Sequence, residues 1–136
     1  MKFNSLIPEL YVSNFDKSLK FYTDLNFKIE YQRKIPRFAF LSSQGAQIMI
    51  QEFEPEWVTG KLEYPYGRGI NLQIHTQNIN SVVQSLKKMN YPINNKVEKN
   101  SYRIGNKLIV SKELRIMDPD GYLLRFSQDI EKKDIE

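Results

Sequence analysis

The chain has 136 residues, of which 40% are hydrophobic, and this length fits one domain with a buried core. It contains no Cys and a single His, which excludes disulfides, thiolate zinc sites, Cys nucleophiles and any site needing two His from one copy. The net charge is +4, but 20 basic residues are interspersed with 16 acidic ones. Because neither a basic stripe nor an apolar run of about 18 residues is present, the sequence predicts a cytoplasmic protein without nucleic-acid or membrane partners.

The first half of the sequence predicts a strand, a helix and three further strands. Period-two alternation indicates strands over residues 7–12, 28–33, 37–42 and 46–53. The helix is indicated by four residues at helical spacing, Phe15, Leu19, Tyr22 and Leu25. Asn26 follows this helix and tolerates the left-handed conformation that often ends one. Gln44-Gly45 supplies a turn between the last two strands.

The second half repeats this order, and residues 14–27 align with residues 78–91. Both copies begin with polar residues of the kind that cap a helix, Asn14 and Asn78 first among them. Its helix is indicated by Ile79, Val82, Val83, Leu86 and Met89, and Asn90 is the counterpart of Asn26. Strands are predicted over residues 70–75, 93–98, 102–104, 113–117 and 122–128. The sequence Asp118-Pro119-Asp120-Gly121 predicts a hairpin turn. Residues 54–69 are expected to link the halves, and residues 129–136 are expected to form a frayed tail.

The pattern predicts an α+β fold, a single domain over residues 1–136 with β-α-β-β-β units at about residues 6–53 and 70–128. It resembles the glyoxalase, bleomycin-resistance and dioxygenase superfamily, also called the vicinal oxygen chelate fold. The resemblance rests on residues 18–22, residues 67–74 and residues 118–126. It implies a curved mixed sheet with a concave cavity and with the helices on the outer face.

Strand alternation separates two faces of the predicted sheet without help from the family. One face is apolar and is predicted to be core, with Leu10, Val12, Ile48, Ile50, Leu72, Ile74, Leu124 and Phe126. The other face mixes polar, aromatic and flexible side chains, among them Glu9, Tyr11, Met49, Gln51, Asn71, Gln73, His75, Arg125 and Ser127. The second face is therefore the predicted binding face.

Metal-dependent members of this superfamily place His and Glu ligands on the concave face. By motif alignment the resemblance puts those four ligand positions at Ile7, Met49, Asn71 and Arg125. These residues do not make a ligand set for a divalent ion, and Arg125 brings a permanent positive charge. No cofactor is therefore predicted. His75 lies about 13 Å beyond Asn71 along a strand, and we predict that it has a structural role or lies on the surface.

A chain of this superfamily without the metal ligands resembles the bleomycin-resistance branch. Members of that branch sequester an antibiotic in grooves between the subunits of a dimer, without a protein-held metal and without catalysing a reaction. We therefore expect a homodimeric, glyoxalase-like binding protein for a bleomycin-type antibiotic or a similar small molecule. The predicted ligand-binding residues are Phe38, Phe40, Met49, Gln51, Trp57, Tyr66, Asn71, Gln73, Tyr102 and Arg125. Phe38 aligns with a ring-stacking position of that branch, and packing in the core is the competing role.

Several of these residues have a second interpretation. Trp57 and Tyr102 could instead pack at a subunit interface, and the polar amides could simply bind water. Arg125 needs a partner, either Glu9 or an anionic group of a ligand. Glu9 and Arg125 would also be the acid–base candidates if the protein were a metal-independent enzyme, and a small-molecule-sensing module is a third alternative. Because the sequence does not indicate a pair of a nucleophile and a base, it favours a protein that is not an enzyme.

Overall fold

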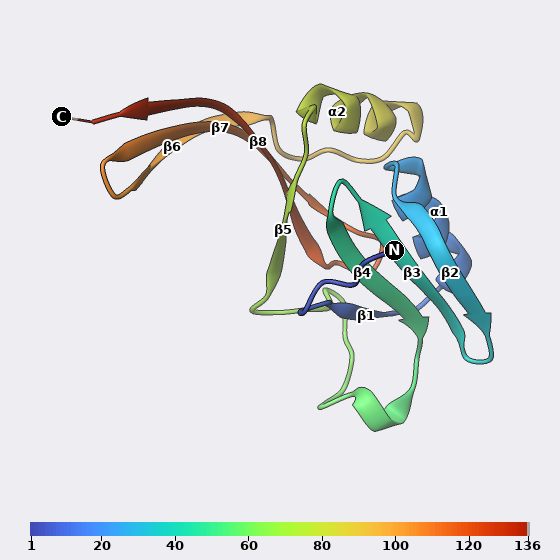
Figure 1. Ribbon diagram of the computed structural model, residues 1–136. Coiled ribbons are helices and arrows are strands. Elements are labelled where there is room, and N and C mark those ends of the chain that lie inside the picture. The colour runs from blue at the N-terminus through green and yellow to red at the C-terminus, as the bar shows by residue number, and fades with distance from the viewer. Residues whose placement is uncertain (136) are drawn as a thin grey trace. The chain divides into compact units, whose positions relative to one another are not determined.

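Two β-α-β-β-β units make up residues 1–135, which the computed structural model describes (Figure 1). The first unit comprises residues 1–68 together with Asp118–Tyr122, and the second comprises residues 69–117 and the chain from Leu123 onward. Each unit has one four-stranded mixed sheet and one α-helix. The predicted α+β class and the order of elements are confirmed.

The sheet of the first unit has the strand order β1-β4-β3-β2. Its elements are β1 (Glu9–Val12), α1 (Phe15–Asp24), β2 (Lys28–Lys34), β3 (Arg37–Ser43) and β4 (Ala46–Glu52). Strand β1 is parallel to β4, and the other pairs are antiparallel. A short 3-10 helix, Pro55–Trp57, lies inside the predicted linker. This unit therefore matches the elements expected from the first half of the sequence.

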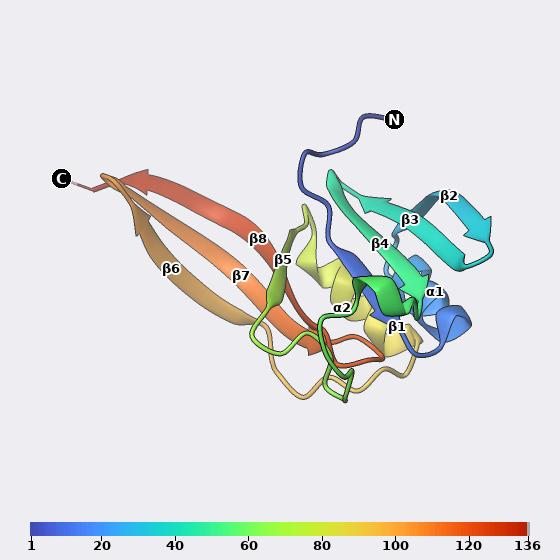
Figure 2. The same cartoon turned by 90° about the horizontal axis from the view of Figure 1, so that it is seen from below.

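The second unit repeats the arrangement, with the strand order β5-β8-β7-β6. Its elements are β5 (Asn71–His75), α2 (Ile79–Lys88), β6 (Glu98–Ile104), β7 (Lys107–Met117) and β8 (Leu123–Asp134). Figure 2 shows β6, β7 and β8 running side by side along a curved arm. Strand β5 pairs in parallel with β8, so the two units share one topology.

Two predictions about the second unit are wrong. Residues 93–97 are not a strand, because Pro92 and Asn94-Asn95 interrupt the chain there, and β6 begins only at Glu98. Residues 129–134 are not a frayed tail, since β8 continues to Asp134 and pairs with β7 along its length. An ion pair between Lys107 and Asp134 joins the ends of these two strands. The mixed charges of this segment therefore belong to a paired strand.

Asparagines begin and end both helices, as the sequence predicts. The side chain of Asn14 accepts a hydrogen bond from the backbone N–H of Lys17 at 3.1 Å, and Asn78 does the same for Ser81 at 3.2 Å. These bonds satisfy N–H groups that the first turn of a helix leaves unpaired. Asn26 has φ 68° and Asn90 has φ 55°, the left-handed geometry that turns the chain out of the helix.

The predicted apolar face is the core of each sheet. Seven of its residues are buried: Leu10, Val12, Ile48, Ile50, Ile74, Leu124 and Phe126. Leu72 is half-buried. Helix α1 packs on β4 in the first unit, and α2 packs on β7 and β8 in the second. The core prediction is thus confirmed.

Buried polar groups hold the Asp118–Tyr122 turn in place within the first unit. The Asp118 carboxylate accepts hydrogen bonds from the backbone N–H groups of Asp120 and Tyr122, each at 2.9 Å, and from the Tyr22 hydroxyl at 2.6 Å. Asp120 accepts from the backbone N–H and the hydroxyl of Ser13. The turn itself is the predicted hairpin between β7 and β8. Its two carboxylates thus act as acceptors for the surrounding backbone.

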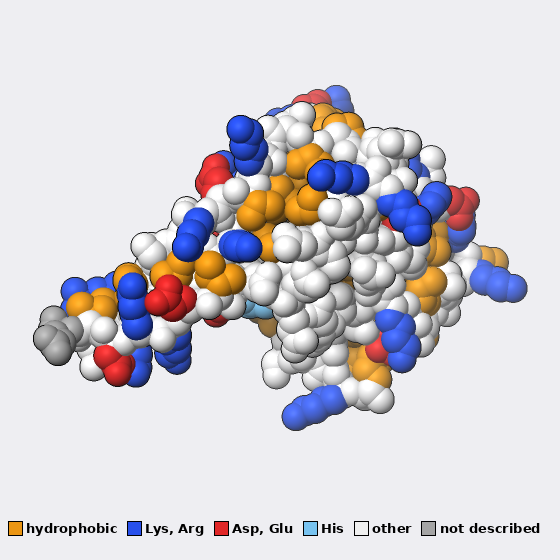
Figure 3. All heavy atoms as spheres, turned by 90° about the horizontal axis from the view of Figure 1, so that it is seen from above, with side chains coloured by type: hydrophobic (Ala, Val, Ile, Leu, Met, Phe, Trp, Pro, Cys, Tyr) orange, Lys and Arg blue, Asp and Glu red, His pale blue; other side chains and the backbone are white. Residues whose placement is uncertain are grey.

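Charged side chains of both signs are mixed on the surface. In Figure 3, Lys and Arg side chains alternate with Asp, Glu and hydrophobic side chains over the face shown. Among residues 1–135, neither helix is long and apolar enough to cross a membrane.

Candidate functional site

A polar cavity of about 370 Å³ opens on the second sheet, on the face opposite its core. We call it the second-sheet cavity, and it is lined by Gln73, Asn100, Ser101, Tyr102, Ser111, Glu113, Arg125 and Ser127. Strand pairing brings several of these residues together, because Gln73 is opposite Arg125 and Glu113 is opposite Ser127. All four strands therefore contribute to one surface.

Arg125 is held in place by two neighbours on this face. Its Nε donates to the Glu113 carboxylate at 2.8 Å, and its Nη1 donates to the Asn71 side-chain oxygen at 3.1 Å. The bonded Glu113 raises the pKa of the guanidinium further above its already high value. The prediction of Glu9 as the partner is wrong, because β7 places Glu113 diagonally next to Arg125 in the sheet.

Two serines add hydroxyl groups to the wall of the cavity. Ser111 and Ser127 are each only 2% exposed, and within residues 1–135 neither hydroxyl has a hydrogen-bond partner. Tyr102 contributes a ring that is 39% exposed, and burial together with the nearby Asp129 raises the pKa of its hydroxyl. The phenol is therefore protonated at neutral pH and directs its proton to Asp129. Hydroxyl and amide groups thus surround one fixed guanidinium.

The structure brings together four of the predicted ligand-binding residues. Gln73, Tyr102 and Arg125 line the second-sheet cavity, and Asn71 is bonded to Arg125 at its edge. Sequence reasoning missed Asn100, Ser101, Ser111, Glu113 and Ser127 as site residues. Ser127 had been assigned to the binding face by alternation. Asn100 and Ser101 lie on β6 and Ser111 lies on the first part of β7, where the predicted strand boundaries were wrong. Glu113 lies inside the strand predicted over residues 113–117, but its place beside Arg125 was not predicted.

Four other predicted residues belong to the first sheet. Phe38 and Phe40 are 2% and 1% exposed, and the Tyr31 ring lies 5.7 Å and 5.3 Å from their ring centres. The Arg33 guanidinium covers Phe38 at 4.7 Å, so stacking of a ligand on Phe38 would require these groups to move. Gln51 is buried and Met49 is half-buried beside them. This arrangement favours the core role that the sequence left open for Phe38.

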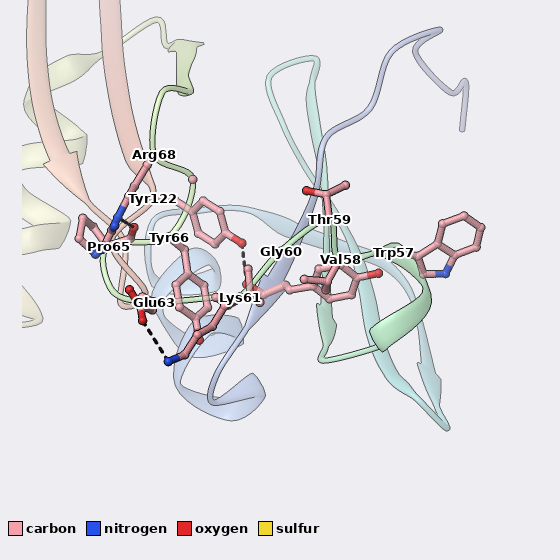
Figure 4. Close-up of a pocket in the computed structure, with 13 residues that line it drawn as sticks. Trp57, Val58, Thr59, Gly60, Lys61, Glu63, Pro65, Tyr66, Arg68 and Tyr122 are labelled. Atoms are coloured by element: carbon pink, nitrogen blue, oxygen red, sulfur yellow. Dashed lines mark hydrogen bonds and ion pairs between the residues drawn. The ribbon is translucent and has the colours of Figure 1, made fainter.

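The remaining two predicted residues, Trp57 and Tyr66, line a separate cavity of about 360 Å³ in the first unit. Figure 4 shows Tyr66 beside Tyr122 inside this cavity, whereas the Trp57 indole extends outward from the loop. The rings of Tyr66 and Tyr122 meet edge to face at 5.8 Å, and the Tyr122 hydroxyl donates to the Tyr11 carbonyl at 2.8 Å. The predicted residues therefore fall into two cavities and one packed sheet face.

The residues at the family's metal-ligand positions do not fit a divalent cation. Arg125 is paired with Glu113, and the Asn71 oxygen is occupied by the guanidinium. In the described part of the chain, no three His, Cys, Asp or Glu side chains gather as potential metal ligands. A permanent positive charge beside the Asn71 oxygen opposes cation binding.

The lining of the second-sheet cavity suits the recognition of a polar organic molecule. Gln73 and Asn100 can both donate and accept hydrogen bonds, and the serine hydroxyls can do the same. The Arg125–Glu113 pair has its geometry fixed before any ligand arrives, which reduces the entropy lost on binding. His75 is exposed on the same strand, and its Nε2 lies 3.4 Å from the Gln73 amide nitrogen.

Comparison with known proteins gives the family by sequence and the fold by structure. A glyoxalase/bleomycin resistance protein/dioxygenase superfamily member from Vibrio splendidus 12B01 is 31% identical, covering 90% of this chain and 95% of that one, with a TM-score of 0.41. A virulence protein from Salmonella typhimurium is 23% identical, covering 96% and 100%, with a TM-score of 0.61. A bleomycin-binding protein complexed with bleomycin is 17% identical, covering 94% and 100%, with a TM-score of 0.60.

The last two similarities are below 25% identity and concern the fold alone. No curated protein matches the chain. The family model described as Glyoxalase/Bleomycin resistance protein/Dioxygenase superfamily matches residues 3–126, which is nearly the whole chain. The chain therefore belongs to the glyoxalase/bleomycin resistance protein/dioxygenase superfamily.

Proposed function

We propose that this protein binds a bleomycin-type glycopeptide, or a similar polar small molecule, without a metal and without catalysing its conversion. The second-sheet cavity carries this proposal, because it presents hydroxyls, amides and one positioned guanidinium on a single face. A glycopeptide offers complementary amide and sugar groups. The structural similarity to a bleomycin-binding protein supports this choice of ligand.

The proposal also favours binding over catalysis. The two buried serine hydroxyls have no hydrogen-bonded base within residues 1–135, so neither is set up as a nucleophile. Arg125 and Glu113 are bonded to each other and are thus committed to a structural ion pair. An arrangement of this kind supports a role in holding a ligand in place more than a role in proton transfer.

Calorimetric titration tests this function directly. We expect metal-free bleomycin and copper-loaded bleomycin to bind the chelator-treated protein at micromolar concentrations. The two forms should bind similarly, because the proposed site recognises polar organic groups without a protein-held ion. The absence of heat with both forms would contradict the proposal that bleomycin is the ligand.

Replacing Gln73 by alanine should weaken bleomycin binding by about 3–10-fold, the loss expected for one or two neutral hydrogen bonds. Gln73 is exposed on β5, so the melting temperature should stay within about 1 °C of the original. The matched control is Gln84→Ala, which removes an exposed glutamine from α2. Equal affinities of the two variants would contradict the assignment of the cavity as the binding site.

We further propose a homodimer, as the family resemblance implies. Strands β5 and β6 are the edge strands of the second sheet, and all seven residues of β6 are exposed. Uncovered edge strands are commonly protected by association with another chain. Light scattering at the concentrations used for calorimetry should give a mass of about two chains, and a monomer mass there would contradict this proposal.

A further inference from the structure

The loop between β4 and β5 lines most of the cavity of about 360 Å³ in the first unit, which we call the loop cavity. None of its lining residues belongs to the second-sheet cavity. Tyr66 and Tyr122 form two of its walls, and Leu62 and Pro65 add apolar surface. A cavity of this volume holds one small organic molecule, so its lining indicates which chemical class would fit.

The two tyrosine rings are held in place by the surrounding backbone. The backbone N–H of Tyr66 donates to the Asp120 carbonyl at 2.8 Å, and the rings of Tyr66 and Tyr122 meet edge to face at 5.8 Å. Gly67 has φ 70°, and an added Cβ there would lie 2.6 Å from Cδ1 of Tyr122, so the loop runs directly against this ring. An aromatic surface is therefore present before any ligand arrives, which lowers the entropy lost on binding.

Among the described residues that line the loop cavity, Arg68 carries the one charge without an opposite charge beside it. The other two charged residues, Lys61 and Glu63, pair with each other at 3.1 Å. Arg68 belongs to none of the ion pairs within residues 1–135. Instead, its Nε donates to the Pro65 carbonyl at 3.3 Å and its Nη2 to the Tyr64 carbonyl at 3.0 Å. These carbonyls orient the guanidinium but do not neutralise it.

The hydrogen bonds of Arg68 leave one edge of its guanidinium unused. Figure 4 shows the Arg68 side chain beside Pro65, where Nε and one N–H of Nη2 face the loop carbonyls. The N–H groups of Nη1 and the second N–H of Nη2 remain. The edge that they form matches the two oxygens of a carboxylate. Because the neighbouring Gly67 lies against the Tyr122 ring, this cation is next to the aromatic wall.

We infer that the loop cavity binds a small aromatic carboxylate, whose oxygens accept from the unused edge of Arg68 and whose ring packs against Tyr66 and Tyr122. Glu63 is the one carboxylate of the lining, and its pairing with Lys61 leaves no unpaired anion there to repel the ligand. This site goes beyond the proposed function, because it lies in the other unit and takes a different chemical class. It holds whether or not the second-sheet cavity binds bleomycin.

Calorimetry of the full-length protein with three related probes tests this inference. Indole-3-propionate carries an aromatic ring and a negative charge, indole-3-propionamide carries the ring alone, and cyclohexanepropionate carries the charge without an aromatic ring. We expect indole-3-propionate to bind at least about tenfold more tightly than either of the others at low ionic strength. Added salt should weaken its binding and leave that of the amide unchanged. No binding of indole-3-propionate, or binding equal to that of either other probe, would overturn the inference.

The variant Arg68→Gln tests where the charge of the probe binds. Arg68 is exposed, and its replacement should reduce the preference for indole-3-propionate over the amide from at least about tenfold to about twofold or less. The matched control is Arg103→Gln, because Arg103 is exposed, lies outside both cavities and donates through Nε to the Gly105 carbonyl at 2.8 Å. A merely structural role of Arg68 would weaken both probes equally. A preference that stays near tenfold in Arg68→Gln would therefore overturn the inference, whatever the loss of affinity.

The variant Tyr66→Leu tests where the ring of the probe binds. It should weaken indole-3-propionate by about 3–10-fold, because the contact between two aromatic rings is lost. The matched control is Tyr64→Leu, since Tyr64 lies in the same loop, is 64% exposed and does not line the loop cavity. Melting temperatures establish that both variants are folded. Equal losses of affinity in the two folded variants would place the probe elsewhere and overturn the inference.

Discussion

Replacing Asp118 by alanine is expected to lower the free energy of unfolding by about 3–5 kcal/mol. The Asp118 side chain is 2% exposed, and its carboxylate accepts three hydrogen bonds within the first unit. Alanine would remove the carboxylate that accepts from the Tyr22 hydroxyl and from two backbone N–H groups. Urea denaturation at neutral pH measures this loss, and a change below about 1 kcal/mol would contradict the role given to the turn.

Asp118 should also make stability depend on pH. Burial raises its pKa from 3.8 to about 6, outweighing the three hydrogen bonds that favour the charged form. Because the folded pKa is the higher one, this group stabilises the fold fully below pH of about 4, and the contribution is lost as the pH rises through about 6. A shift of about two pKa units corresponds to about 3 kcal/mol.

The variant Asp118→Asn isolates this effect, because its amide oxygen can still accept from the two backbone N–H groups and its charge never changes. Wild type and variant should have similar stability near pH 4. The variant should then gain about 3 kcal/mol relative to the wild type by pH 7.5. A stability difference that stays constant across this range would show that Asp118 ionises normally in the fold.

Replacing Gly121 by alanine is expected to cost about 2–5 kcal/mol of stability. Gly121 has φ 90°, and an added Cβ would lie 2.6 Å from both Cα and Cβ of Pro65. The new methyl group would therefore collide with backbone as well as with a side chain. Both the left-handed conformation and the collision contribute to the loss.

Gly45 provides the matched control for this substitution. Its φ is 89°, almost the same, but an added Cβ has nothing within 4 Å. Gly45→Ala should therefore cost only the conformational part, about 1–2 kcal/mol. Thermal melting of the two variants compares them, and an equal loss would mean that the contact with Pro65 contributes nothing.

Local signals predicted most of the fold. The helix ends could be predicted because they depend on local features of Asn. Asn14 accepts a hydrogen bond at the start of α1, and Asn26 adopts the left-handed conformation after its end. The apolar faces could be predicted because the alternation of apolar and polar side chains depends only on the strand itself. The turn at Asp118-Pro119-Asp120-Gly121 was predicted, but its hydrogen bonds to Ser13 and Tyr22 were not, since they join residues far apart in the sequence.

The candidate site was predictable only in part. Arg125 and Gln73 were assigned to the correct face by alternation, and both line the cavity. Glu113 was missed as the partner of Arg125, because pairing across strands depends on the register of β7 against β8. The covering of Phe38 by Arg33 and Tyr31 likewise depends on the pairing of β2 with β3. Side-chain partners on neighbouring strands can be predicted only when the register of the strands is known, and the sequence alone does not determine that register.

The most direct test of the account maps bleomycin onto the protein by nuclear magnetic resonance. Amide signals of the ¹⁵N-labelled, chelator-treated protein are followed during titration with metal-free bleomycin. We predict that the largest shifts occur around Gln73 on β5, Ser111 on β7 and Arg125 on β8, and that added divalent ions do not alter them. Absent shifts, or shifts that require a divalent ion, would contradict the central claim that a polar, metal-independent face of the second sheet binds the ligand.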